Sequence, residues 1–229
     1  MRKKEWATWL RVCAVCGKWD PPITWLCKSC SNSWRRLRQS NDEAAHLSKG
    51  LACYSLAQWR GEDALAKAIA YSQKGGRAAE VWALLAKEFT AMRAALDADL
   101  SVPRMAHEGR LRFASPPRRT TEDDHASLFA KSLAQLWRSP YVDVFGARVG
   151  PSQKSLSRSR RAEVFVQAKA GLELEKDLLW IVVDDVISSG ATVAACWRAL
   201  GEPSSFEAWT LLARCEFSSV TDKTSRARK

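Results

Sequence analysis

The sequence predicts an α/β fold built on a parallel sheet, with a small zinc-binding module at its N-terminal end. Three observations lead to this prediction. Strand-like and helix-like segments alternate from residue 51 onward, which is typical of βαβ units. The apolar run over residues 178–183 is typical of a strand buried on both faces. Two Cys-x2-Cys pairs before residue 31 indicate a metal-binding module.

The length of the chain sets its domain organisation. A chain of 229 residues has room for one ordinary α/β domain and a small appendage. We therefore expect a cysteine module with a linking helix over residues 1–48, the α/β domain over 49–215, and a basic tail over 216–229.

Apolar spacing and breakers such as Gly75-Gly76 predict the order of elements. The segment 51–59 mixes aromatic and apolar residues as an edge strand does. Residues 104–121 and 150–161 are expected to be loops, because they are basic or polar and lack a regular period. Helices are expected at 31–45, 63–71, 78–93, 121–137 and 191–200, and strands at 51–59, 100–103, 142–149, 178–183 and 206–213.

Two of these helices carry a capping residue in the sequence. Asn32 or Ser33 is expected to cap the first helix. Thr121 with Asp124 has the spacing of a capping pair for the helix that ends near Trp137. Both helices therefore have a predicted starting point.

The segment from Leu179 to Thr192 has the pattern of a phosphate-binding strand, turn and helix. The strand is expected to stop at Asp184 and Asp185, which places both carboxylates where α/β proteins bind ligands. The N–H groups and hydroxyls of the turn can surround a phosphate at the positive end of the helix. The carboxylates can accept hydrogen bonds from two ribose hydroxyls, directly or with Mg²⁺ nearby. The predicted phosphate-binding residues are Ser188, Ser189, Gly190, Ala191 and Thr192.

Two other interpretations of this segment compete with a ribose-phosphate site. A Walker B strand also ends in Asp after apolar residues, but it requires a G-x-x-x-x-G-K-[ST] loop, which this chain lacks. An ordinary strand, turn and helix with an incidental acidic pair is the plainer alternative. The coincidence of strand, acidic pair, hydroxyls and glycine within a short segment favours the ribose-phosphate site.

Two knuckles, Cys13-x2-Cys16 and Cys27-x2-Cys30, predict a structural zinc site. Each knuckle is expected to place two thiolates on one tight turn, and four thiolates complete a closed tetrahedral site. Redox-active pairs are the alternative, although no thioredoxin-like βαβ pattern surrounds these cysteines. The other cysteines are expected to be buried apolar residues: Cys53, Cys196 and Cys215.

Composition favours a soluble, cytoplasmic protein with anionic partners. No apolar run is long enough to cross a bilayer, and no apolar stretch typical of a secretory signal follows the charged N-terminus before Arg11. The seven cysteines then belong in a reducing compartment. The net charge of +11 and the pI of 9.6 indicate phosphorylated small molecules or nucleic acid as partners, or basicity for solubility alone.

The segment from Leu179 to Thr192 resembles the fingerprint of the type I phosphoribosyltransferases. More narrowly, the chain resembles the competence protein F (ComF) family, which joins a cysteine motif to that domain. Residues 71–76 (YSQKGG) resemble the Lys-containing turn of the family. Residues 153–161 with Phe165 resemble its Gln…Leu-Ser…Arg…Phe segment, which is a flexible hood in related transferases.

The chain departs from the family pattern at two places. Residues 101–105 (SVPRM) stand where the family has a Val-Pro-Val-Pro loop for pyrophosphate, and His125 falls where the family has an Asn-Gln pair. The resemblance implies that Asp184 and Asp185 hold the ribose of phosphoribosyl pyrophosphate in the presence of Mg²⁺. The resemblance implies Lys74, Arg158 and Arg161 as pyrophosphate and hood residues, with a solvated basic loop as the alternative for the two arginines, and Arg104 is a candidate to replace the lost pyrophosphate contacts.

The resemblance implies a function in natural competence. We expect a phosphoribosyltransferase-like protein that binds phosphoribosyl pyrophosphate or a related sugar phosphate and supports DNA uptake by handling single-stranded DNA with DNA-uptake proteins. The helix containing Trp34, the Arg118-Arg119 loop and the basic tail suit a single strand, although Trp34 fits core packing as well as base stacking. The alternative is an active phosphoribosyltransferase of nucleotide metabolism with an unidentified acceptor.

Overall fold

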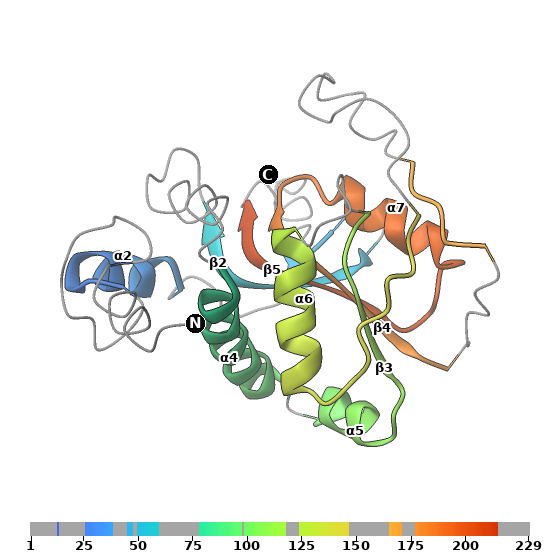
Figure 1. Cartoon of the computed structure of the whole chain (residues 1–229), viewed down its shortest axis with the longest axis horizontal. Coiled ribbons are helices and arrows are strands. Elements are labelled where there is room, and N and C mark those ends of the chain that lie inside the picture. Colours follow the sequence, from blue (N-terminus) through green and yellow to red (C-terminus); the bar gives the residue numbers. More distant parts are fainter. Residues whose placement is uncertain are drawn as a thin grey trace, which may run out of the picture.

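A parallel sheet forms the centre of the protein, as Figure 1 shows. The computed structural model describes residues 13, 26–38, 45–47, 50–59, 78–97, 99–117, 124–146, 165–170 and 177–214. The sheet order is β1-β2-β5-β4-β3; β2, β5, β4 and β3 run parallel, and β1 pairs antiparallel with β2. The strands are β1 (Ala45–His46), β2 (Ala52–Trp59), β3 (Leu111–Ala114), β4 (Leu179–Ile187) and β5 (Phe206–Arg214).

Helices cover both faces of the sheet. Along β4, Ile181 and Val183 face a core shared with α4 and α6, whereas Trp180 and Val182 face a second core shared with α7. This period of two, with both faces buried, explains why β4 is apolar throughout its first half. The described helices are α2 (Lys28–Arg38), α4 (Ala78–Leu96), α5 (Ser101–His107), α6 (His125–Leu136) and α7 (Ala191–Ala199).

The topology sets where a ligand can bind. Helix α4 follows β2, α6 follows β3 and α7 follows β4, so these three helices start beyond the carboxyl ends of their strands. The positive ends of the helix dipoles therefore lie at the same edge of the sheet. The α/β prediction is confirmed, and so are the elements β2, α4, β4, α7 and β5, each within four residues of its expected ends.

Two predictions in the region 100–121 are wrong. The segment 100–103 is not a strand, because α5 begins at Ser101. The carboxylate of Asp97 accepts hydrogen bonds from the backbone N–H groups of Ser101 (3.2 Å) and Val102 (2.8 Å), so a side chain upstream starts this helix. The expected loop over 104–121 contains the strand β3, in which Leu111 and Phe113 are fully buried.

Other expected boundaries also move. Helix α2 begins at Lys28, so neither Asn32 nor Ser33 caps it. Helix α6 begins at His125, where Asp124 is the cap and accepts a hydrogen bond of 3.0 Å from the Ser127 N–H. In the described part of the expected strand 142–149, the only β pairing is an isolated bridge at Phe145. The expected helix at 63–71, Thr121, the whole expected loop 150–161 and the basic tail lie outside the described residues.

Candidate functional site

Asp184 and Asp185 lie on a part of β4 that extends past its neighbour β3. The last paired residue of β3, Ala114, is opposite Val182. On the other side, β4 stays paired with β5 as far as Ile187. The strand therefore does not stop at the two aspartates, as the sequence had predicted. Instead β3 stops short of them, and the aspartates face the carboxyl edge of the sheet from within a paired strand.

Local hydrogen bonds hold the two carboxylates. The N–H of Asp185 donates to Asp184 Oδ1 at 2.9 Å, and the N–H of Val186 donates to Asp185 Oδ1 at 2.9 Å. On β5, the buried Thr210 hydroxyl donates to the Asp185 carbonyl at 3.2 Å. Burial raises the pKa of Asp184 well above its usual range, and the nearby charges of Asp185 and Asp124 raise it further. A cation or hydroxyl groups of a ligand would relieve this excess of negative charge.

The start of α6 adds two residues to this edge. Asp124 follows β3 in the chain, and its negative charge helps to raise the pKa of Asp184. The next residue, His125, packs its ring against Trp82 of α4 with 5.9 Å between centroids. Its buried Nδ1 has no hydrogen-bond partner among the described residues. The sequence identified Asp124 only as a cap, and the Asp-His pair at the start of a helix is the signal that could have placed it at the site.

The turn after β4 is open to solvent and leads directly into α7. Ser188 and Ser189 are exposed, and Gly190 caps α7 in the left-handed conformation, with φ of 72°. No side chain caps α7, although the Ala191 N–H lies 3.4 Å from the hydroxyl of Ser189. The first N–H groups of α7 are thus directed to the carboxyl edge, where they can meet an anion.

Gly190→Ala is expected to lower the free energy of unfolding by about 1–2 kcal/mol through left-handed strain alone. A further loss is expected because an added Cβ would lie 3.1 Å from Leu47 Cδ2, and Leu47 is buried. Gly109→Ala is the matched control, since Gly109 has φ of 70° with nothing within 4 Å of the added Cβ. Urea unfolding measures both losses, and equal losses would show that the contact with Leu47 has no energetic effect.

The structure brings Asp184, Asp185 and the residues from Ser188 to Thr192 together but separates Arg104 from them. Arg104 is exposed on α5, which leads into the amino end of β3, at the opposite edge of the sheet. The residues that follow the carboxyl end of β3 are Ser115, Pro116 and Pro117, which the sequence analysis missed. Lys74, Arg158 and Arg161 lie outside the described residues.

A short antiparallel stem lies beside the end of β3. Tyr141 bridges in parallel to Phe113, and its hydroxyl lies 2.9 Å from that of Ser115. The chain then continues to Gly146, whose N–H donates to the Gln167 carbonyl at 2.9 Å, while the Lys169 N–H donates to Val144 at 2.8 Å. This stem fixes both ends of the segment 147–164, which contains most of the predicted hood.

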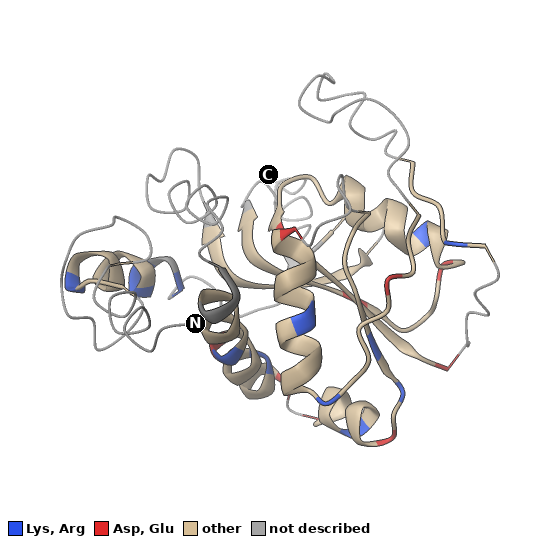
Figure 2. Cartoon of the chain, viewed as in Figure 1, with Lys and Arg blue, Asp and Glu red and all other residues tan. Residues whose placement is uncertain are grey.

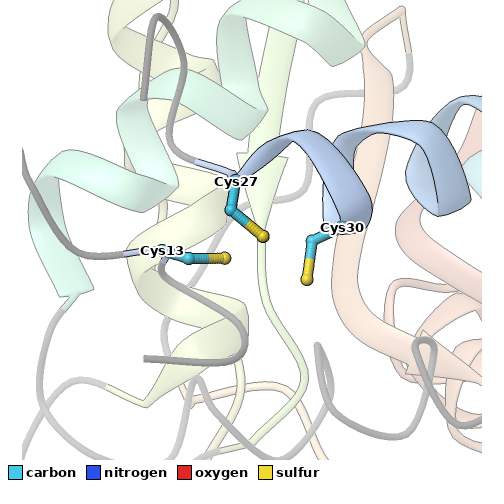
Figure 3. A group of neighbouring side chains, drawn as sticks. All are labelled: Cys13, Cys27 and Cys30. Carbon is cyan, nitrogen blue, oxygen red and sulfur yellow. The ribbon is translucent and has the colours of Figure 1, made fainter. Parts of the chain in front are cut away.

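Three of the predicted metal ligands form a cluster. The sulfur atoms of Cys13, Cys27 and Cys30 all lie within 4.8 Å of one another, as Figure 3 shows. Tetrahedral zinc with Zn–S bonds of about 2.3 Å requires sulfur separations of about 3.8 Å, so small side-chain adjustments bring the three thiolates to a metal. Cys27 and Cys30 flank the start of α2 rather than a free tight turn. Cys16 lies outside the described residues.

The remaining described cysteines are buried, as expected. Cys196 lies on the buried face of α7, and Cys53 lies on β2 near Asp184. Burial, together with the charge of Asp184, raises the pKa of Cys53 to about 12. Cys53 is therefore a protonated thiol at neutral pH and a poor nucleophile. Cys215 lies outside the described residues.

Basic residues gather on α2, which Figure 2 shows at one end of the molecule. Arg35 and Arg36 are exposed, whereas Trp34 is only 4% exposed and belongs to the core. The base-stacking role considered for Trp34 is therefore wrong for this conformation. None of the described helices combines the length and the apolar character needed to cross a membrane.

The fold and this edge define an α/β protein with an acidic strand end, a left-handed glycine turn and a separate cysteine cluster. No protein-family model matches the chain, and no curated protein matches it.

Proposed function

We propose that the chain binds a ribose 5-phosphate group, in particular that of phosphoribosyl pyrophosphate, at the carboxyl ends of β3 and β4. The observation that carries this proposal is the placement of Asp184 and Asp185 directly before an uncapped helix start at Gly190. The likeness of this segment to type I phosphoribosyltransferases, and of the chain to the ComF family, supports the same ligand.

Each part of the ligand has a matching group in this proposal. The N–H groups at the start of α7, with the hydroxyls of Ser188, Ser189 and Thr192, bind the 5′-phosphate. Asp184 and Asp185 accept hydrogen bonds from the ribose hydroxyls. Mg²⁺ offsets the negative charge of the pyrophosphate and of the carboxylates, and Asp124 lies close enough to Asp184 to share in that charge balance.

Calorimetric titration with phosphoribosyl pyrophosphate and Mg²⁺ tests this proposal. We expect the wild type to bind, and Asp184→Asn/Asp185→Asn to bind at least about tenfold more weakly, which corresponds to about 1.4 kcal/mol. Asp99→Asn is the control, because Asp99 is an exposed residue in the turn before α5. No binding by the wild type would exclude the ligand, and equal binding by the double variant would exclude the site.

For the cysteine cluster we propose a structural zinc ion with Cys16 as the fourth ligand. Three sulfur atoms at compatible distances support this assignment. The wild type is expected to hold one zinc per chain, measured by elemental analysis. A metal content near zero in the reduced, zinc-supplemented protein would exclude it.

We further propose that ligand binding serves natural competence through the handling of single-stranded DNA. The exposed Arg35 and Arg36 on α2 support contacts with DNA phosphates. Because Trp34 is buried, α2 would contact the sugar-phosphate backbone of the DNA and not stack on its bases. Binding of a labelled single strand should then weaken steeply as salt rises. Affinity that does not change with salt would contradict this part of the proposal.

An active phosphoribosyltransferase is the second candidate. In that reaction the acceptor forms a bond to ribose C1 as pyrophosphate leaves with the bonding electron pair, and the protein positions and screens charge. The partly buried Asp184 favours this candidate, since burial and the nearby carboxylates raise its pKa, and a carboxyl group able to take up a proton at this edge could assist the acceptor.

A further inference from the structure

The turn that leads into α7 has an exposed side and a buried side. Ser188 and Ser189 are exposed, whereas Gly190 is buried. Both ends of the turn are anchored in the core that α7 shares with the sheet, since Ile187 is 2% exposed and Val193 is 1% exposed. The exposed side can therefore meet a ligand while the buried side packs against the protein.

Leu47 packs directly against the buried side of this turn. A Cβ atom added at Gly190 would lie 3.1 Å from Leu47 Cδ2, 3.3 Å from Cδ1 and 3.4 Å from Cβ. Apart from the residues adjacent in the chain, the three nearest atoms thus all belong to one leucine. Leu47 is 3% exposed and lies in the same core as Ile187 and Val193. Its side chain therefore supports the backbone at Gly190 from below.

A tight turn fixes the backbone of Leu47. The Leu47 N–H donates to the Leu51 carbonyl at 2.9 Å, and the Leu47 carbonyl accepts a hydrogen bond from the Gly50 N–H at 3.0 Å. Gly50 has φ of 73°, a left-handed conformation that glycine adopts without strain. This turn joins β1 to β2, and the two strands pair with each other. Leu47 thus approaches Gly190 from a hairpin that its own hydrogen bonds hold in place.

The same hairpin reaches the ribose half of the proposed site. Cys53 on β2 is 1% exposed, and the negative charge of Asp184 contributes to the raised pKa of its thiol. The interaction between two charges weakens with distance, so this effect indicates that the two side chains are close together. One hairpin therefore borders both Asp184 and Gly190.

We infer that Leu47 is a positioning residue for the phosphate turn: its side chain holds Gly190, and with it the first N–H groups of α7, in the ligand-binding arrangement before a ligand arrives. This inference rests on the proposed ribose 5-phosphate site. Leu47 acts through the backbone at Gly190. A turn that is already ordered loses less conformational entropy on binding, so its affinity for the ligand is higher.

Calorimetric titration of the full chain with phosphoribosyl pyrophosphate and Mg²⁺ tests this role. Leu47→Ala is expected to bind at least about tenfold more weakly than the wild type, because the ligand must then order the turn. Leu47→Met nearly conserves the side-chain volume and should bind almost as well as the wild type. Leu47→Val removes one methylene group, disturbs folding less than Leu47→Ala, and should have an intermediate affinity.

Leu51→Ala is the matched control, because Leu51 is a buried leucine of the same hairpin and the same core. The variant keeps the backbone carbonyl that accepts the hydrogen bond from Leu47. Both alanine variants remove a buried side chain and are expected to lower the unfolding temperature. Only Leu47→Ala should weaken ligand binding, so affinity distinguishes positioning from a general loss of stability.

Two measurements without ligand test the contact itself. The Ala194 N–H donates to the Gly190 carbonyl at 2.9 Å, so its hydrogen exchange reports opening of the turn. This exchange should be at least about tenfold faster in Leu47→Ala than in Leu51→Ala. The loss of stability caused by Gly190→Ala should also be smaller in the Leu47→Ala background, because the two Cδ atoms that an added Cβ would meet are then absent.

Equal affinity of Leu47→Ala and the wild type would overturn the inference and leave the ribose 5-phosphate site unaffected. Equal weakening by Leu47→Ala and Leu51→Ala would overturn it too, and so would unchanged exchange at Ala194 in Leu47→Ala. No binding by the wild type would overturn the proposed function and this inference together.

Discussion

Arg93→Met is expected to lower the free energy of unfolding by about 3–5 kcal/mol, the range for a buried ion pair that loses one partner. Arg93 is 2% exposed and donates two hydrogen bonds to the Glu207 carboxylate, at 2.8 Å and 3.3 Å. It also forms an ion pair with Asp97, with 3.9 Å between Nη1 and Oδ2. Its guanidinium also lies 4.0 Å from the ring centroid of Tyr54. Removal of the cation leaves two acidic groups in the interior without their counter-charge.

Chemical denaturation measures this loss, with Lys169→Met as the control. Lys169 and Asp143 form a surface pair at 2.9 Å, and such pairs contribute about 0–1 kcal/mol. Both variants remove one positive charge, so the difference between them reports burial. Adding Glu207→Gln to Arg93→Met should recover part of the loss, and similar losses for Arg93→Met and Lys169→Met would contradict the ion-pair explanation.

The same network predicts acid sensitivity. Burial opposes ionisation of Asp97, but hydrogen bonds from Val102 and Ser101, with the charge of Arg93, hold its pKa below the ordinary value of 3.8. A carboxyl group with a lowered folded-state pKa stabilises the fold above its unfolded pKa, and this stabilisation is lost as pH falls through the folded value. The contribution of Asp97 should therefore disappear only below pH 3.8.

Asp184→Asn is expected to raise the free energy of unfolding of the ligand-free protein at pH 8, in contrast to Arg93→Met, because it removes a carboxylate whose charge is disfavoured by burial and by its acidic neighbours. Asparagine has the same shape and can still accept the hydrogen bond from the Asp185 N–H. It removes one of two adjacent carboxylates at a partly buried position. The structure thus predicts that the residue proposed to bind ribose costs stability when no ligand is bound.

The pH dependence of the stability gained by Asp184→Asn shows whether electrostatic strain causes it. The folded-state pKa of Asp184 is raised, so its favourable contribution is complete below the ordinary value of 3.8 and is lost as pH rises through the raised value. The advantage of Asp184→Asn should therefore grow with rising pH and vanish in acid, as measured by urea unfolding at several pH values. Asp99→Asn should show no such trend, and a pH-independent gain would exclude electrostatic strain as the cause.

Sequence periodicity was sufficient for the long elements of this fold. β4 and α7 could be predicted because apolar runs and helical spacing report burial directly. β3 could not, because its four residues are too few to show a period and its burial depends on pairing with β4. α5 was mistaken for a strand, since the side chain that starts it, Asp97, lies outside the helix itself.

In the candidate site, residues that are contiguous in the sequence could be predicted, whereas residues placed by contacts with distant parts of the chain could not. Asp184, Asp185 and Gly190 form one continuous segment, so a local pattern could identify them. The position of Arg104 could not be predicted, because it depends on α5, whose existence the sequence did not reveal. The role of Trp34 depends on Glu88, 54 residues away in the chain, so no local pattern distinguishes packing from stacking.

The stem formed by Val144–Gly146 and Gln167–Lys169 has a consequence for how this protein can diverge. Because the Gly146 N–H bonds the Gln167 carbonyl at 2.9 Å, the intervening chain leaves and re-enters the fold at the same place. Doubling the length of a flexible loop with fixed ends costs only about 0.6 kcal/mol. Changes in the number of residues between the two sides of this stem are therefore expected to cost little free energy of folding.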